Sequence, residues 1–360
     1  MARHIVRGAL ALLIGTTVFA AIPALAFDGW RLESATIIEG KGSAWDYIAY
    51  DQPSGRLYIG HRKEGLQVFD VTTKKLVKTV ENTTAQSSNG ATLMPEFDLG
   101  ISNNEDGSVT PFKMSTLDAL APIKLGDELD TSHYDPATKR ILVNMASGKD
   151  GTELVVLAAP SLAKIGTIKV ATKKPEHADV DGNGNMFVAA RDLEMVYRID
   201  MKEMKVTAEW PAPGCGQTNS MAMDVANKRL MLGCRGNDKI KPAFAVMDSE
   251  TGKIIFTQEV GGGNDGVVYD ADLKRIFLTN GVNAIMNIFE QVDANSYRQV
   301  EALGTHAGVR SLAIDPKSKK LFAVTAEGSA DFAKKVTTSV SPYYANTFFP
   351  NTFKVLTYSK

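Results

Sequence analysis

Short apolar runs separated by polar turns recur along the whole chain. In residues 220–233, an apolar segment is followed by a turn that begins at Asp224, a basic residue and a second apolar segment. Runs rich in Ile, Val, Leu, Tyr and Phe favour strands, and Asp, Pro, Ser, Asn and Gly between them favour turns. Each copy therefore predicts a β-hairpin of two antiparallel strands.

The hairpin pattern repeats at a nearly constant spacing. The turn aspartates of the clear copies are Asp51, Asp135, Asp181, Asp224, Asp270 and Asp315. The last five are 43 to 46 residues apart, whereas 84 residues separate the first two, which leaves room for one degenerate copy at 91–103. A second hairpin follows each copy, as at 66–80, so each repeat supplies four strands. Seven such repeats predict an all-β, seven-bladed β-propeller.

Single strands are expected at the two ends of the repeat region. Residues 30–40 precede the first copy and residues 352–360 follow the last one. Pairing of these N- and C-terminal strands in the last blade would close the ring and remove two exposed edges. The predicted blades span 45–82, 83–126, 127–171, 172–213, 214–261, 262–305 and 306–360, and no linker interrupts them. We expect a single propeller domain over 27–360.

The first 26 residues have the pattern of a secretory signal peptide. Arg3 and Arg7 precede an apolar run at 8–22, and Ala24-Leu25-Ala26 forms an A-x-A cleavage site. A membrane anchor is the alternative, but the apolar run is short for a bilayer. No later segment is long and apolar enough to span a membrane, so we expect a protein exported to a bacterial periplasm.

Composition and charge limit the classes of partner. The 360 residues are 44% hydrophobic and 22% charged, as in ordinary globular proteins, and 40 basic and 41 acidic residues are interspersed to a net charge of −1. This balance gives no support to nucleic-acid binding. We expect a monomer that meets a small molecule or a protein partner at its central channel.

The two cysteines, Cys215 and Cys234, flank one predicted hairpin. If the hairpin turns at Ala226, Cys234 lies opposite about Asn219, a few residues from Cys215. In an exported chain this spacing favours a disulfide, with free thiols or a metal pair as the alternatives. A structural zinc site would need more ligands of this kind.

Several phrases of the sequence resemble the YVTN-repeat, YncE-like β-propellers. These phrases are KPEHADVDGNGNMFVAARDLEMVYRID, CGQTNSMAMDVANKRLMLGC, GGGNDGVVYDADLKRIF and GVRSLAIDPKSKKLFAV. The resemblance covers nearly all of the chain after residue 26 and implies an exported seven-bladed propeller. It implies little about chemistry, because the family is similar both to propeller lactonases and to binding proteins.

Polar residues concentrate in the loops expected at one end of the channel. In a four-stranded blade, the loop before the innermost strand and the loop after the second strand open on the same face, where propeller sites tend to lie. The residues predicted to bind a ligand there are Asp46, Arg62, Asn219, Asp265, Asn280 and Arg310. The arginines would suit a carboxylate or phosphate, and structural ion pairs are the alternative.

The same loops carry the histidines that remain after removal of residues 1–26. A divalent transition metal is predicted at His61, His133, Glu176, His177 and His306, because imidazole and carboxylate are common metal ligands. The alternative is that these side chains never converge. The run 179–184 superficially resembles a calcium loop, but its twelfth position is Ala190, no helices flank it, and it occupies a hairpin turn.

Three functions are compatible with these patterns. The first is an exported protein that binds a small ligand, metal or partner at the channel mouth without turnover. The second is a metal-dependent, lactonase-like hydrolase, in which a bound metal would activate water. The third is an interaction scaffold that uses blade edges or the irregular insertion at 328–350. No GxSxG motif supports nucleophilic catalysis.

Overall fold

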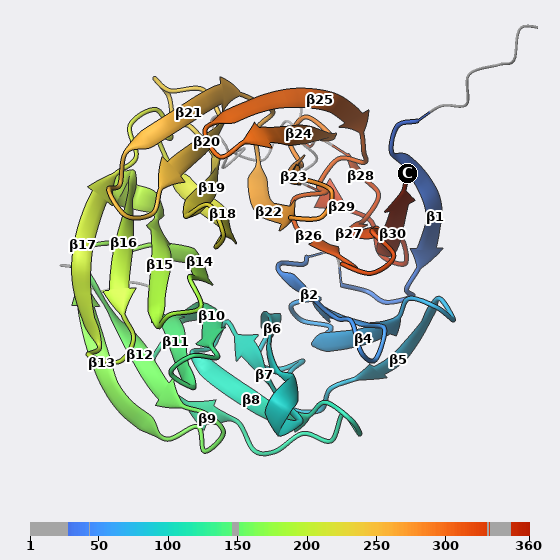
Figure 1. The fold of residues 1–360 in the computed structure, drawn as a ribbon. Coiled ribbons are helices and arrows are strands. Elements are labelled where there is room, and N and C mark those ends of the chain that lie inside the picture. The colour runs from blue at the N-terminus through green and yellow to red at the C-terminus, as the bar shows by residue number, and fades with distance from the viewer. Residues whose placement is uncertain (1–27, 43, 146–150, 330, 332–346) are drawn as a thin grey trace, which may run out of the picture.

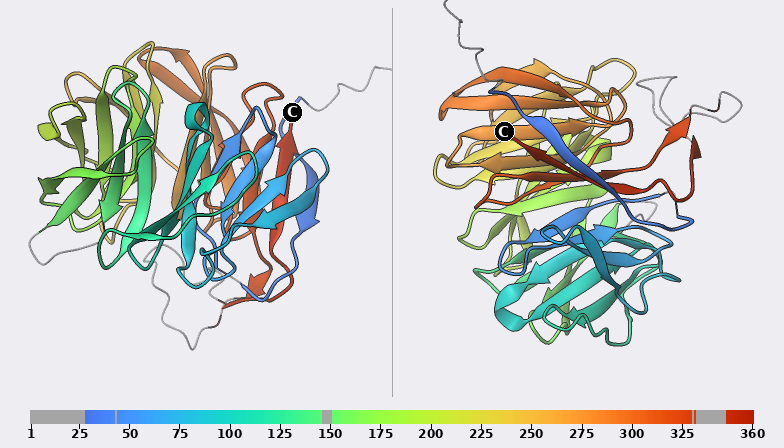
Figure 2. Two further views of the ribbon diagram at one scale, coloured as in Figure 1. Left: turned by 90° about the horizontal axis from the view of Figure 1, so that it is seen from below. Right: turned by 90° about the vertical axis from the view of Figure 1, so that its right-hand side faces the viewer.

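Seven four-stranded antiparallel sheets, here called blades, surround a central channel (Figure 1). The computed structural model describes residues 28–42, 44–145, 151–329, 331 and 347–360. In six blades the strands follow chain order from the channel outward. Two further views show the blades arranged around the axis, with loops at both faces (Figure 2). The predicted all-β, seven-bladed propeller is confirmed.

The first four blades follow one another along the chain. Blade 1 consists of β2 (Ile48–Asp51), β3 (Arg56–Gly60), β4 (Leu66–Asp70) and β5 (Lys75–Thr79). Blade 2 consists of β6 (Ser88–Met94), β7 (Leu99–Asn104), β8 (Ser108–Lys113) and β9 (Ile123–Lys124). Blade 3 consists of β10 (Leu129–Asp135), β11 (Arg140–Met145), β12 (Thr152–Ala158) and β13 (Lys164–Val170). Blade 4 consists of β14 (Pro175–Val180), β15 (Asn185–Ala190), β16 (Met195–Asp200) and β17 (Lys205–Pro211).

The remaining blades complete the ring. Blade 5 consists of β18 (Thr218–Asp224), β19 (Arg229–Cys234), β20 (Ala243–Asp248) and β21 (Ile254–Glu259). Blade 6 consists of β22 (Asn264–Asp270), β23 (Arg275–Asn280), β24 (Ile285–Asp293) and β25 (Ser296–Gly304). Blade 7 consists of β26 (Leu312–Ile314), β27 (Leu321–Thr325), β30 (Lys354–Ser359) and β1 (Arg31–Ile37). Short 3₁₀-helices, η1 (Pro95–Phe97) and η2 (Arg191–Leu193), lie in blades 2 and 4.

The two ends of the chain close the ring, as predicted. Strand β1 pairs with β30 over Arg31↔Ser359 to Ile37↔Lys354, and β30 pairs in turn with β27. Trp30, just before β1, is 4% exposed and packs edge-on against Phe277 of blade 6, with 5.0 Å between ring centroids. The N-terminal segment therefore joins blade 6 to blade 7 as well as completing blade 7.

The repeated aspartates form the inner hairpin turns. In a typical turn, Asp135 accepts hydrogen bonds from the Ala137 and Thr138 backbone N–H groups, both at 3.2 Å. Lys139, before the second strand, has a φ of 55°. In the degenerate second copy η1 replaces this turn, and Asp98 takes the left-handed conformation instead, with a φ of 51°. The Asp135 side chain thus satisfies the backbone of its own turn, whereas the backbone N–H of Asp98 bonds Pro95 O and the Asp98 side chain accepts hydrogen bonds from Ser115.

The hydrophobic core lies between the blades. Each of the seven apolar clusters joins two neighbouring blades, so the seven interfaces of the ring each have one. Between blades 3 and 4, for example, Leu142 and Val156 pack with Met186 and Val188, all fully buried. Because each sheet buries both faces against neighbours, no blade forms a complete core alone.

Some predicted segments lie outside the described residues. The signal peptide at 1–26 is one, and most of the insertion at 328–350 is another. The described ends of that insertion pair as β28 (Gly328–Ser329) and β29 (Thr347–Phe348), and Phe348 packs on Trp45, with 4.8 Å between ring centroids. No helix in the described part of the chain has the length and hydropathy to cross a membrane.

Closure by the N-terminal segment can be tested at Trp30. Trp30→Ala removes a buried ring from the contact between blades 6 and 7 and should lower the free energy of unfolding by about 3–5 kcal/mol. Urea unfolding followed by circular dichroism measures the change. Leu32→Ala, at a position on β1 that is 42% exposed, is the control and should change stability by about 0.5 kcal/mol or less. Equal effects of the two substitutions would contradict this account of closure.

Candidate functional site

A polar cavity of about 200 Å³, here called the mouth cavity, opens where the inner strands begin. Every blade contributes at least one wall residue. The acidic wall residues are Asp46, Glu105, Glu128, Asp130, Glu176 and Asp265. The basic wall residues are Arg62, Lys174, Arg191, Arg235 and Arg310, and Tyr47, Asn89 and Leu129 complete the wall.

β-Bulges bring polar side chains into this wall. In blades 2 to 6, the register between the first and second strands shifts near the start of the inner strand. The residues left without a register partner there are Asn89, Asp130, Glu176 with His177, Asn219 and Asp265. A bulge re-aims a side chain that regular alternation would point elsewhere. The same local irregularity therefore places wall residues in blades 2, 3, 4 and 6, and in blade 5 it brings Asn219 to Asp265.

Three arginines and two aspartates form a continuous ion-pair network across blades 5, 6, 7 and 1. Arg62 and Asp46 are 2.5 Å apart, and Arg310 lies 3.6 Å from Asp46 Oδ1 and, through Nε, 3.3 Å from Asp265 Oδ2. Arg235 pairs with the other carboxylate oxygen of Asp265. Burial opposes ionisation of Asp265, but Arg235 and Arg310 outweigh it and lower the pKa of this carboxyl. The aspartates thus hold the three guanidinium groups in place.

The arginines are the accessible members of these pairs. Side-chain exposure is 20% to 27% for Arg62, Arg235 and Arg310, against 4% to 8% for Asp46 and Asp265. A ligand in the cavity would therefore meet guanidinium groups that are oriented from behind by buried carboxylates. Such preorganisation reduces the ordering cost of binding.

A second polar cluster joins blades 1 and 4 across the channel. The Tyr47 hydroxyl donates to Glu176 Oε2 at 3.0 Å, and Arg191 donates to Glu176 Oε1 at 2.9 Å and to Gln217 Oε1 at 3.0 Å. Burial and the Glu176 charge raise the pKa of Tyr47 well above its ordinary value. Since blades 1 and 4 are not neighbours in the ring, Tyr47 forms part of a floor beneath the mouth cavity.

Asp130 lies beside this cluster and is the carboxyl of the wall whose ionisation is most strongly opposed. Burial, and then the charge of Glu176, to which Asp130 is hydrogen-bonded, raise the pKa of Asp130 well above its ordinary value. Two adjacent carboxyl groups do not both ionise readily, so this environment favours the neutral form of Asp130. In that form Asp130 could donate a hydrogen bond, and the Glu176 carboxylate beside it could accept one.

Two further cavities, of about 350 and 400 Å³, lie deeper in the channel. Both are lined largely by apolar inner-strand residues, and both touch Tyr47 and His177, whose ring centroids are 6.1 Å apart. His177 also lies near His133, at 4.8 Å between ring centroids. Burial lowers the pKa of His177 to about 4. Burial, and then the neighbouring His177 ring, lower the pKa of His133 well below its ordinary value. Both rings are therefore neutral at pH 7.

The five residues predicted to bind metal occupy different environments. Glu176 lines the mouth cavity, and His133 and His177 line the deeper channel. His61 is buried, stacks on Phe353 and bonds Gln67 at 2.8 Å. His306 is partly exposed, 3.9 Å from Glu327. Within the described residues, no three His, Cys, Asp or Glu side chains group in a way that could hold a metal ion.

The residues predicted to bind a ligand are mostly brought together. Asp46, Arg62, Asp265 and Arg310 line the mouth cavity. Asn219 donates to Asp265 at 2.8 Å, whereas Asn280 is fully buried and donates to Asn287 at 2.8 Å, away from the wall. The arginines are engaged in ion pairs, as in the alternative raised from the sequence.

The sequence analysis did not identify Tyr47, Glu105, Glu128, Leu129 and Lys174 as wall residues. Tyr47 follows Asp46 directly, so its position before the first inner strand was a usable signal. Its contact with Glu176, 129 residues away, could not be predicted from the sequence, because that contact depends on the width of the closed channel.

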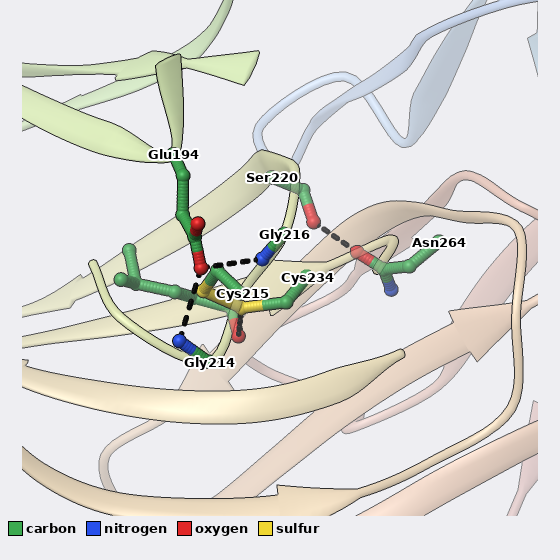
Figure 3. The surroundings of a disulfide bond; sticks show 8 residues. Glu194, Gly214, Cys215, Gly216, Ser220, Cys234 and Asn264 are labelled. Atoms are coloured by element: carbon green, nitrogen blue, oxygen red, sulfur yellow. Dashed lines mark hydrogen bonds between the residues drawn. A yellow bond between two sulfur atoms is a disulfide. The ribbon is translucent and has the colours of Figure 1, made fainter. Parts of the chain in front are cut away.

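The predicted disulfide between Cys215 and Cys234 is confirmed (Figure 3). A bulge at Asn219 makes Thr218, instead of Asn219, the partner of Cys234. Glu194 Oε1 of blade 4 accepts hydrogen bonds from Gly214 N at 3.0 Å and Gly216 N at 2.8 Å on either side of Cys215. The disulfide thus holds the loop that carries Gln217 next to the end of β19, which Arg235 follows directly.

Removal of this disulfide should destabilise the protein. The two cysteines are 19 residues apart, and a cross-link of this span contributes about 3 kcal/mol by restricting the unfolded chain. We expect a Cys215→Ala/Cys234→Ala variant to lose about that much in urea unfolding. In the wild type, thiol titration in denaturant without reductant should detect no free thiol. Two titratable thiols would contradict the disulfide.

Acid should destabilise the fold through His177. Its pKa of about 4 in the folded protein lies below the ordinary value of 6.5, so between these pH values the unfolded chain binds more protons. The free energy of unfolding should therefore fall as pH drops from 6.5 to 4, by at most about 3 kcal/mol from this group. Comparison of His177→Gln with the wild type across this range isolates the effect. An identical pH dependence in both proteins would contradict it.

The comparisons with known proteins identify the fold but no family. No protein-family model matches the sequence, and no curated protein matches it. The structure is similar to a chain in the crystal structure of the mitotic checkpoint complex, with a TM-score of 0.68 and 11% sequence identity. The match covers 87% of this chain and 95% of that chain. At this identity the likeness shows the propeller fold alone.

Proposed function

We propose that this chain is an exported binding protein that recognises a small charged ligand in the mouth cavity without turnover. The observation that carries the proposal is the network in which buried Asp46 and Asp265 orient three partly exposed arginines toward one cavity. Arginine suits carboxylate or phosphate groups, because its planar fork can donate two parallel hydrogen bonds.

The size of the cavity supports a small ligand. Its volume of about 200 Å³ is below the roughly 300–1,000 Å³ of pockets that hold drug-sized molecules. The Tyr47 and Glu176 contact forms a floor, so a ligand would be held at the mouth instead of passing into the deeper channel. Binding without turnover is favoured because the charged groups of the wall mostly hold one another in fixed positions.

The compartment proposed is the bacterial periplasm. The signal-peptide pattern at 1–26 supports export, and a disulfide is compatible with an oxidising compartment. The resemblance to YVTN-repeat propellers supports the same location, and we include membership of that family in the proposal.

Ligand binding at the mouth cavity can be tested with a matched pair of double variants. Glu128→Gln/Lys174→Gln removes one acidic and one basic wall residue and keeps the net charge. A library of small charged metabolites is screened by thermal unfolding of the wild type. A ligand at 100 times its Kd should stabilise the folded state by about 2.7 kcal/mol. We expect this stabilisation to fall at least several-fold in the variant.

The control is Lys241→Gln/Glu259→Gln. These side chains form an exposed ion pair, 2.9 Å apart, away from the cavity wall. The control should keep the wild-type response. If every stabilising compound acts equally on both variants, binding occurs elsewhere and the proposal is wrong.

A further inference from the structure

The charges of the mouth cavity are divided between its two sides. Blades 5, 6, 7 and 1 contribute Arg235, Asp265, Arg310, Asp46 and Arg62, here called the basic side. On this side three arginines face two aspartates, so the basic residues outnumber the acidic ones by one. Arg62 also pairs with Glu105 of blade 2, at 3.2 Å, where the two sides meet. The pairing geometry leaves the guanidinium groups more exposed than the carboxylates. This side therefore favours an anionic group.

The wall from blades 2, 3 and 4 has the opposite character, and we call it the acidic side. It contains four acidic residues and two basic residues: Glu105, Glu128, Asp130, Glu176, Lys174 and Arg191. The acidic residues outnumber the basic ones by two, so this side is net negative. Among the described residues Glu128 forms no ion pair, so its charge at the wall is not balanced by a fixed partner.

A buried acceptor on the acidic side points to a donor in the ligand. Asn89 is 2% exposed and lines the cavity, and its Nδ2 donates to Leu129 O at 2.9 Å. Its Oδ1 is buried and has no hydrogen-bond partner among the described residues. An unpaired buried acceptor costs free energy, which a donating group in the cavity would recover. An ammonium group supplies such a donor and matches the charge of this side.

We propose that the mouth cavity recognises a small zwitterion, of the class of free amino acids. Its carboxylate would face Arg235, Arg310 and Arg62, and its ammonium group would face Asn89 Oδ1 and the acidic residues of blades 3 and 4. This inference rests on the proposed function and narrows it to one ligand class. A simple anion would satisfy the basic side but leave the acidic side and Asn89 without a partner.

The test uses isothermal titration calorimetry on the mature wild-type protein. The probes are the twenty standard amino acids, with sodium acetate and sodium phosphate as anions and methylammonium chloride as a cation. For the tightest amino acid, the N-acetyl derivative removes the ammonium charge and the amide removes the carboxylate charge. We expect each derivative to bind at least ten-fold more weakly than the parent, as do the separate anions and cation.

Two single variants test which side of the cavity binds the carboxylate of the ligand and which side binds its ammonium group. Arg235→Lys keeps a positive charge beside Asp265 but loses the planar fork, so it should weaken the amino acid at least five-fold while leaving the weak binding of methylammonium unchanged. Glu128→Gln should weaken the amino acid and methylammonium but leave acetate unchanged. The control Glu250→Gln, at an exposed ion pair with Lys228, should behave as wild type.

The outcomes separate the two proposals. If acetate or phosphate binds as tightly as any amino acid, and the mouth variants weaken it, the zwitterion inference is wrong and the binding function stands. If an amino acid binds equally well after either of its charges is removed, the inference is also wrong. If none of the probes and none of the screened metabolites binds, both proposals are wrong.

Discussion

The structure depends on closure of the ring by the N-terminal segment. A blade buries both faces of its sheet, so every blade needs two neighbours, and an open row of blades would expose two apolar faces. Pairing of β1 with β30 links the first residues of the described chain to its last strand, and packing of Trp30 on Phe277 links them to blade 6. Closure also sets the diameter of the channel, and therefore which side chains meet across it.

The channel mouth shows how a regular scaffold produces an irregular site. Strand alternation in the inner strands positions apolar side chains for the deeper channel, and the bulges at the start of β6, β10, β14, β18 and β22 interrupt that alternation at one level. Five blades thereby place amide or carboxyl groups at the same height. Because the arginines come from loops next to these bulges, the ion pairs form between blades and join them at the mouth.

The electrostatics of the mouth reflect burial as much as charge. The carboxyl of Asp265 is buried yet ionised, because two guanidinium groups outweigh the cost of desolvation. Asp130 lies beside Glu176 instead of an arginine, and burial and the Glu176 charge raise the pKa of its carboxyl. The pKa values of two carboxyl groups in one cavity are thus shifted in opposite directions by their different neighbours.

The sequence by itself determined the class of fold, the seven repeats, the closing pair of strands and the disulfide, because these follow from local strand and turn patterns and from their period. It also indicated the face on which Asp46, Arg62, Asp265 and Arg310 meet. Only the tertiary structure decided that Asn280 turns into the core, that His61 stacks on Phe353, and that Tyr47 reaches Glu176. Those outcomes depend on one-residue bulges and on distances across a closed ring, which no local pattern encodes.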